Sequence, residues 1–388
     1  MTLRPPLVIN AGNVQQLQSG DGITVGSATV GSVALATATG TAGQFRQTNG
    51  AGTESWGWAY PFRNRIINGK MEIDQRRGGS SKPLVPLAAL SGTASNYGLD
   101  RWATWISSGG SSIAFAQRTS VGSGFFNAYQ LGRVSGQTST PVINLAQVIE
   151  TANCYDLQGQ QVTLSFYARC DANFSAASSN LSFAIATGTS NDEGLTSMAA
   201  GTWAGYAITA TQTATLTSTV TRYSYTFTLG GSVSEIGVNF FYTPVGTAGA
   251  HDGYEITGVQ LEQGLYATPF EHRPVMVEIH LCQRYFEKSY DLDVMPGTNT
   301  FTGARTMGTI STATTTNVRY ADTFKVTKRV SPTPYWISTD GTGNTIGTAG
   351  GDLTPGAWWV GTNCYAVEIG ISSTDARISF HYQADAEL

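Results

Sequence analysis

The chain has 388 residues and a formal net charge of −4, a length that predicts two or three domains with cores of their own. Charged residues make up only 12% of it, about half of the usual ~25%. The absence of a basic cluster argues against a nucleic-acid-binding protein.

The first residues, MTLRPPLVIN, lack the basic start and the long apolar run of a secretion signal. No uncharged apolar stretch reaches the ~18 residues that a membrane helix needs, so we expect no membrane insertion. Cys154, Cys170, Cys282 and Cys364 lie far apart without metal-binding spacing. We therefore expect buried free thiols and synthesis in a reducing cytoplasm.

Residues 1–60 are rich in Gly, Ala, Thr and Ser, and their apolar positions are too sparse for an independent core. This composition fits either a flexible linker or an arm for attachment and oligomerisation. Trp56 and Trp58 near its end are unlike a solvated linker. We therefore interpret residues 1–60 as an arm.

Residues 61–271 contain many short stretches with the two-residue alternation of β-strands. In QVTLSFYARC, Val162, Leu164 and Phe166 share one face, and Tyr167 and Arg169 share the other. No helical pattern of comparable length interrupts these stretches. The prediction is an antiparallel, two-layered β-sandwich of the jelly-roll type.

The outward strand faces carry small or hydroxylated side chains with occasional larger ones such as Tyr167, Arg169, Asn239 and Phe241. A shallow, polar face dotted with aromatic rings suits a sugar, whose C–H groups stack on rings. Aromatic residues in β proteins lie more often in the core, and that alternative applies to each candidate.

Further stacking candidates lie outside these faces. Trp203 and Tyr206 are the leading ones, because Gly201 and Gly205 predict a loop around them. Trp102 and Trp105 fall on opposite faces of one predicted strand, so one should be core. We predict that the other tryptophan can stack on a sugar, as can Tyr129.

Residues 256–289 are the one long stretch in which a strand pattern passes directly into a helix pattern. Gly258 stands where the apolar alternation slips by one residue, which indicates a β-bulge. A connecting helix is predicted from Pro274 to Ser289, within a segment spanning residues 272–289. Its apolar face is wide enough to be covered on more than one side, by two β domains or by another copy of the chain.

Ile279, Cys282 and Phe286 lie on that wide apolar face and are predicted to be buried at the junction. Residues 290–388 then return to alternating strands punctuated by Gly and Pro, which predicts a second, smaller β-sandwich. Trp358 and Trp359 lie near its loops. They form the alternative candidate glycan site.

Catalysis and metal binding find little support. A glycosidase needs two carboxyl groups across a cleft, and no spacing pairs the acidic candidates, which are Asp100, Glu150, Asp252, Glu255, Glu262 and Glu271. The four histidines are scattered. We expect a non-enzymatic protein without a cofactor, although loop carbonyls with Asp192, Glu193 or Asp252 leave room for a structural calcium ion.

Several motifs together resemble bacteriophage tail-fibre and virion-appendage proteins. The most specific one is QLEQGLYATPFEHRP at residues 260–274 followed by CQRYF at 282–286, which is similar to their "QLE-G-ATPFE-RP" and "CQRYY". Phe286 departs from the second tyrosine of that pattern. NRIINGKMEIDQRRGG (64–79) with LDRW (99–102) resembles their opening. The terminal FKVTKRVSPTP and ADAEL are similar to their last domain.

The resemblance implies a structural component of a phage virion fibre, made in the host cytoplasm and forming a homotrimer. Residues 1–60 would join it to other virion proteins, and the jelly roll would display a surface that binds host polysaccharide. Two alternatives stay open. One is a head-fibre or capsid-decorating protein without receptor binding, and the other is a glycan depolymerase.

Overall fold

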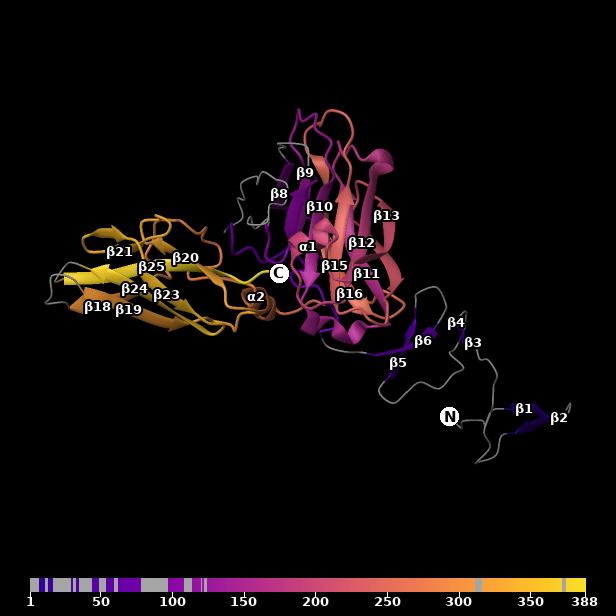
Figure 1. Cartoon of the computed structure of the whole chain (residues 1–388). Coiled ribbons are helices and arrows are strands. Elements are labelled where there is room, and N and C mark those ends of the chain that lie inside the picture. The colour runs from indigo at the N-terminus through magenta and orange to yellow at the C-terminus, as the bar shows by residue number, and fades with distance from the viewer. Residues whose placement is uncertain are drawn as a thin grey trace, which may run out of the picture. The chain divides into compact units, whose positions relative to one another are not determined.

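The computed structural model describes short strand pairs between residues 7 and 58, and then residues 62–77, 97–107, 114–119, 121, 124–310, 316–371 and 375–388. The chain divides into two compact units, Met1–Pro61 and Phe62–Leu388. Its fold is all-β with antiparallel sheets, as the alternation predicted (Figure 1). No helix in the described part of the chain has the length and hydrophobicity needed to cross a membrane.

The first unit contains three two-stranded antiparallel pairs in its described residues. They are β1 (Leu7–Asn10) with β2 (Asn13–Gln16), β3 (Thr29–Val30) with β4 (Val33–Ala34), and β5 (Gln44–Thr48) with β6 (Glu54–Trp58). In the last pair the guanidinium of Arg46 lies 5.5 Å from the ring centre of Trp56. The attachment role predicted for residues 1–60 stays a prediction.

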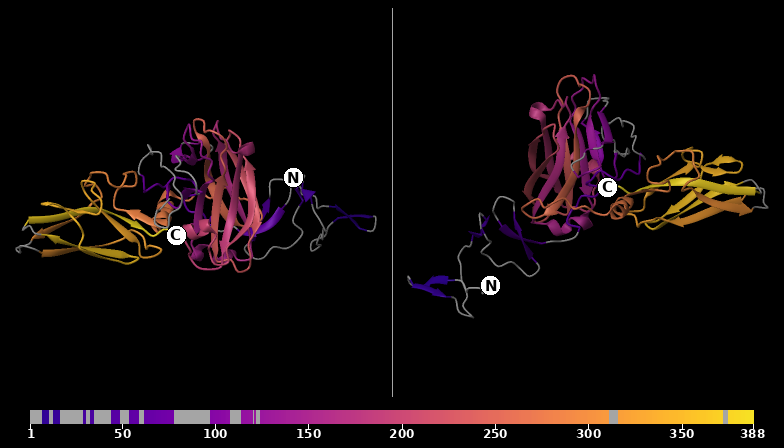
Figure 2. Two further views of the ribbon diagram at one scale, coloured as in Figure 1. Left: turned by 45° about the horizontal axis from the view of Figure 1, so that its top comes forward. Right: turned by 180° about the vertical axis from the view of Figure 1, so that it is seen from behind.

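The first sandwich consists of two five-stranded sheets, which Figures 1 and 2 show as two layers. Sheet I has the order β13 (Ala207–Thr215), β12 (Asn180–Gly188), β15 (Glu235–Tyr242), β10 (Ile143–Ile149) and β7 (Ala103–Ile106). Sheet II has the order β14 (Thr221–Thr228), β11 (Gln161–Cys170), β16 (Asp252–Gln263), β9 (Ala128–Arg133) and β8 (Ala114–Thr119). Short 3₁₀ turns lie at Thr151–Asn153, Tyr155–Leu157 and Ala177–Ser179.

The core lies between the two sheets and follows the predicted alternation. Val162, Leu164 and Phe166 of β11 face it, as do Val238 and Phe240 of β15. The ring of Phe166 meets that of Phe240 edge-on at 5.0 Å between centroids. Because every second residue points inward, the intervening residues of each strand form the outer faces.

The β-bulge predicted at Gly258 is confirmed. The pairing of β11 with β16 shifts between Ser165 and Tyr167, and Gly258 takes a left-handed φ of 57°. A Cβ at this position would lie 2.6 Å from Phe125 and 2.7 Å from Tyr167. Only glycine satisfies both the backbone and the space here.

The predicted connecting helix is shorter than expected. Helix α2 spans Val275–Gln283, and Phe286–Lys288 form strand β17, paired with β25 (Asp375–Asp385). The prediction of a helix as far as Ser289 was wrong, because Phe286 satisfies its backbone across the sheet, opposite Asp385.

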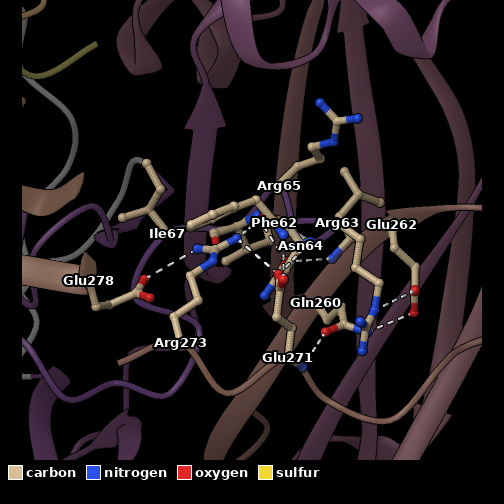
Figure 3. A network of polar contacts seen from close by, with 12 residues as sticks. Phe62, Arg63, Asn64, Arg65, Ile67, Gln260, Glu262, Glu271, Arg273 and Glu278 are labelled. Carbon is tan, nitrogen blue, oxygen red and sulfur yellow. Dashed lines mark hydrogen bonds and ion pairs between the residues drawn. The ribbon is translucent and has the colours of Figure 1, made fainter. Parts of the chain in front are cut away.

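The wide apolar face predicted for this helix is also wrong in part. Val275 and Met276 are 49% and 59% exposed, whereas Glu278 is buried. The Glu278 carboxylate accepts a hydrogen bond from the backbone N–H of Asn68 and lies 3.6 Å from Arg273 (Figure 3). Because of these polar contacts, the acidic side chain of Glu278 is buried at a position where an apolar side chain was expected.

Burial of the three predicted junction residues differs among them. Cys282 is fully buried, Phe286 is 2% exposed and Ile279 is partly buried. Cys282 packs with Ile67 and Ile73 of the first sandwich, and Ile279 packs against that cluster. Leu292 and Leu388 contact the same cluster. The helix therefore packs against residues from both sides of the junction.

Residues 62–71 run along β16 and the segment that follows it. Figure 3 shows the first of them, Phe62 to Arg65, beside Glu271 and Arg273. The Glu271 carboxylate accepts hydrogen bonds from the backbone N–H groups of Phe62 (2.6 Å) and Asn64 (2.9 Å). Asn64 in turn donates to the carbonyl of Val259 (3.1 Å). Glu271 thus holds Phe62 and Asn64 beside the segment that follows β16.

The second sandwich also has two antiparallel sheets. One centres on β25, which pairs with β17, β18 (Arg305–Ile310), β20 (Thr333–Ser338) and β21 (Ile346–Thr348), with β22 (Gly351–Leu353) on β21. The other has the order β19 (Thr316–Thr323), β24 (Cys364–Ile371) and β23 (Ala357–Val360).

All four cysteines are free, and Cys364 is exposed, contrary to the expectation of burial.

Candidate functional site

A groove lies on the outer face of sheet I. Cross-strand pairing places Thr211, Ala184 and Asn239 side by side on three neighbouring strands. The next row along the strands contains Phe241 and, opposite it, Asn144. Asn144 is in turn the partner of Trp105 on β7. The residues of the groove are therefore neighbours across the strands, far apart in sequence.

Helix α1 (Leu195–Ala200) lies over sheet I (Figure 1). Its residues line one wall of the groove, beside the strands of the sheet. Its Met198 packs on Gly237, where a Cβ would come 2.1 Å from the Met198 sulfur. The helix is short and ends at Gly201, which takes a left-handed φ of 68°. The absence of a side chain at Gly237 thus lets the helix approach the sheet closely.

The α1 wall is also held from the far end of the chain. The carbonyl oxygen of Leu388 accepts hydrogen bonds from the backbone N–H of Leu195 (3.2 Å) and the hydroxyl of Tyr97 (2.9 Å). The Leu388 side chain packs against the cluster that includes Trp105 and Met198. Residues beyond β25 therefore help to position the groove.

The groove has a volume of about 630 Å³, within the range of small-molecule sites. Its lining is mostly apolar, with a few hydroxyl and amide groups. The lining residues are Trp105, Ile106, Ser107, Val142, Asn144, Ala184, Ala186, Thr196, Met198, Ala199, Ala200, Tyr206, Ile208, Thr211, Asn239 and Phe241. None of these described residues carries a charge, and partial burial raises the pKa of the Tyr206 phenol.

Two amide side chains meet at the groove. Asn239 Nδ2 donates to Asn144 Oδ1 at 3.2 Å, and Asn144 Nδ2 lies 3.4 Å from the carbonyl of Val142. Asn239 Oδ1 accepts no hydrogen bond from any described residue, although the atom is buried. A buried acceptor without a partner costs free energy until a donor reaches it.

Tyr206 lines the groove and stays a candidate stacking residue, but the prediction that Trp203 is exposed was wrong. Trp203 is 3% exposed, and its indole N–H donates to the carbonyl of Gly194 at 3.1 Å. It packs below Tyr206, edge to face, at 6.4 Å between ring centroids. The glycines at 201 and 205 do form turns, but these turns fold the indole back under α1.

Tyr167 and Arg169 lie on the outer face of sheet II, away from the groove, so the four leading candidates cannot form one site. Tyr167 is partly buried and packs on Phe125 at 5.0 Å between ring centroids. Arg169 binds the carboxylate of Glu255 at 2.8 Å. Both side chains have structural partners that the strand alternation alone could not reveal.

The prediction that Trp102 and Trp105 lie on opposite faces, with one of them in the core, is confirmed. Trp102 is fully buried between the sheets, and Trp105 lies on the outer face, where its 7% of exposed surface lines the groove. The prediction that Tyr129 can stack on a sugar was wrong, because its side chain is fully buried.

The alternative pair, Trp358 and Trp359, lies on β23 of the second sandwich, about half exposed at 51% and 50%. The Arg319 guanidinium lies 4.8 Å from the ring centre of Trp359. As strand neighbours the two rings point to opposite faces. They therefore do not form one stacking platform.

The acidic candidates for catalysis hold structural positions. Glu150 accepts hydrogen bonds from Arg284 and Tyr285; burial alone would raise its pKa, but these bonds outweigh burial and lower it. Glu262 accepts from the N–H and hydroxyl of Thr268. Burial raises the pKa of Asp100 to about 7. None of the six candidates lines the groove.

Arg133 occupies the place where Asp252 would have met a calcium ion. Its guanidinium binds Asp252 Oδ2 at 2.6 and 2.8 Å. It also donates to five other oxygens, the carbonyls of Gln137, Ser139, Val245 and Gly246 and the hydroxyl of Ser175. These oxygens form a cage that the Arg133 guanidinium already fills. The proposal of Asp252 as a calcium ligand is therefore wrong.

The other two proposed calcium ligands bond backbone groups. Asp192 accepts from the N–H of Thr151 at 2.7 Å, and Glu193 accepts from the N–H of Ala204 at 2.8 Å. Among the described residues, no three His, Cys, Asp or Glu side chains come together as a metal site would require.

No protein-family model matches the chain, and no curated protein sequence matches it. Solved structures with a similar arrangement of strands include the enzymatically active domain of tailspike protein 4 from bacteriophage CBA120. That comparison gives a TM-score of 0.32 and 12% identity over 53% of this chain and 22% of the solved domain's chain. This chain therefore aligns with about a fifth of that domain's length.

Two carbohydrate-binding modules are also similar. The family 11 module from Clostridium thermocellum, solved with a β-1,3-1,4-mixed-linked tetrasaccharide, gives a TM-score of 0.29 and 14% identity over 45% of this chain and 95% of the module. TmCBM61, solved with β-1,4-galactotriose, gives 0.29 and 10% over 52% and 99%. Likenesses this distant assign no ligand to this chain.

Proposed function

We propose that the groove on sheet I binds a glycan. The observation that carries this proposal is the lining itself, in which Trp105, Tyr206 and Phe241 offer ring surfaces beside the Asn144 and Asn239 amides. Sugars present C–H groups that pack on aromatic rings and adjacent hydroxyls that bond amides. An uncharged, half-open groove with this mixture suits an oligosaccharide better than a phosphate-bearing or metal-bound ligand.

We further propose that the protein is a structural component of a phage virion fibre that displays this groove to host polysaccharide. The motifs at residues 64–79, 260–274 and 282–286 support this assignment through their resemblance to tail-fibre proteins. Residues 1–60 would join other virion proteins. Immunogold labelling of purified particles tests the location, and particles without label would contradict it.

Binding is expected to depend on the groove aromatics. Replacing Tyr206 and Phe241 together by alanine should lower the affinity for host polysaccharide by about 5-fold to about 150-fold, since each ring contact contributes about 0.5–1.5 kcal/mol beyond burial. Surface plasmon resonance of the whole chain on immobilised host polysaccharide measures this.

The matched control is Tyr155→Ala, because Tyr155 is 59% exposed and does not line the groove. It should bind as the wild type does. If the folded double variant retains full affinity, the groove is not the site, and Trp358 and Trp359 become the better candidates. Release of reducing ends from the polysaccharide would instead favour a depolymerase.

The fibre assignment includes a homotrimer. Val275 and Met276 on α2 leave apolar surface exposed, which a neighbouring copy could cover. Multi-angle light scattering should therefore give a mass near three times the 41.1 kDa of one chain. One species of 41.1 kDa at micromolar concentration would contradict the trimer.

A further inference from the structure

We infer that the groove selects an uncharged glycan whose sugar presents a methyl group, either as a 6-deoxy carbon or as an acetyl substituent. This inference rests on the proposed glycan binding and narrows it to a ligand class. Three features of the described residues carry it: the charge of the lining, the floor of the groove and the placement of its polar groups.

The lining excludes acidic sugars. A uronic or sialic acid carboxylate in a groove of about 630 Å³ would lose water without meeting a cation, since no Lys, Arg or His lines the described groove. Burying an unpaired carboxylate is among the most costly transfers into a protein. The whole chain adds no attraction, because its formal net charge is −4.

The floor favours a methyl group over a hydroxyl. Ala184 and Ala186 face the groove from β12, and their side chains have no hydrogen-bonding atoms. The backbone of β12 pairs with β15 throughout this stretch, and with β13 except at a bulge between Ala184 and Ala186. A hydroxyl pressed onto the two alanine methyl groups would meet no side-chain partner there, whereas a methyl group gains by leaving water.

The polar groups determine where the methyl group must lie. Thr211, Ala184 and Asn239 stand in one row on adjacent strands, so the polar positions flank the alanine. Thr211 and Asn239 lie two strand spacings apart, about 9.6 Å, which leaves room for a sugar ring with a hydroxyl on each side. A ring lying across the row can therefore bond Thr211 on one side and the Asn239 amide on the other. The substituent between them then rests on Ala184.

The test is inhibition of polysaccharide binding by matched neutral probes. Methyl α-L-fucoside and methyl α-L-galactoside differ only in a methyl against a hydroxymethyl group, and N-acetylglucosamine and glucose differ only in the acetamido group. In one of the two pairs, the sugar that carries the methyl group should inhibit at least about tenfold better than its partner. The pair that shows the preference tells a deoxy sugar from an acetylated one.

Two variants and salt complete the design. Ala184→Val, which fills the floor, should abolish the preference, whereas Thr213→Val should keep it. Thr213 lies on the same face, opposite Ser182, and does not line the groove. Binding should not change from about 0.05 to about 0.5 M salt, since no charge pair is screened.

The outcomes separate this inference from the proposed function. If the Tyr206 and Phe241 double variant loses binding but acidic glycans inhibit best, or neither pair shows a preference, the methyl and charge inference is overturned while the groove stands. If no glycan binds, or binding survives that double variant, the proposed groove function fails as well. Should Ala184→Val not fold, Ala184→Ser replaces it, and an unchanged preference in that variant overturns the inference.

Discussion

Replacing Arg133 by alanine is expected to lower the free energy of unfolding of the first sandwich by about 3–5 kcal/mol. The guanidinium is 1% exposed and its partner Asp252 is fully buried. Removing it leaves that carboxylate without its cation and takes a donor from four loop carbonyls, of which only that of Gln137 also accepts from a backbone N–H, that of Ala248, among the described residues. Chemical denaturation followed by intrinsic fluorescence measures the loss.

Arg169→Ala is the matched control for this change. It also breaks an arginine–carboxylate pair on sheet II, with Glu255 at 2.8 Å, but the Arg169 side chain is 32% exposed. Water reaches the Arg169 side of this pair but hardly the Glu255 carboxylate, whose side chain is 5% exposed, so the expected loss is smaller than that of Arg133→Ala. Equal losses in the two variants would show that the Arg133 cage adds nothing beyond a partly exposed ion pair.

Phe286→Ala is expected to cost about 3–5 kcal/mol, as for other large aromatic residues in cores. The ring is 2% exposed and lies under the guanidinium of Arg76, 3.8 Å from its centre. Arg76 itself binds Asp385 at 2.8 Å and Glu387 at 3.1 Å. The cavity would therefore loosen the ion pairs that hold the end of β25. Thermal unfolding measures the effect.

Met295→Ala is the control, because Met295 is 49% exposed and lies outside α2. A surface truncation of this kind changes stability by no more than about 0.5 kcal/mol. An unchanged melting temperature for Phe286→Ala would mean that the junction does not depend on this ring.

Alternation in the sequence predicted the sandwich well, because in a strand with one buried face apolar side chains must recur at every second residue. It also assigned Trp102 and Trp105 to opposite faces and Asn239 and Phe241 to the outside. The bulge at Gly258 left a visible slip in the same pattern.

The predictions failed where distant partners decide. Which outer face carries the groove depends on strand order, and strand alternation alone does not encode that β12, β15 and β10 become neighbours. Helix α1 is one and a half turns long, too short for a helical period to stand out. Trp203 looked exposed because Gly201 and Gly205 flank it, while the surface that buries it belongs to Gly237 and Ala186.

Asn144 and the end of α2 show the same limit. Nothing local distinguishes Asn144 from other polar strand residues; only its pairing with Phe241 and Trp105 makes it part of the groove. In CQRYF the helical pattern runs on past Gln283, and only the distant β25 explains why the chain becomes a strand at Phe286.

The contact between Leu388 and Leu195 has a consequence for biosynthesis. Ribosomes build the chain from its amino end, so sheet I and α1 leave the ribosome long before the residues that anchor this wall of the groove. A nascent chain can form both layers of the first sandwich while the α1 wall still lacks this anchor. The α1 wall of the groove is therefore completed only when residues 386–388 have been translated and have folded back onto a domain made much earlier.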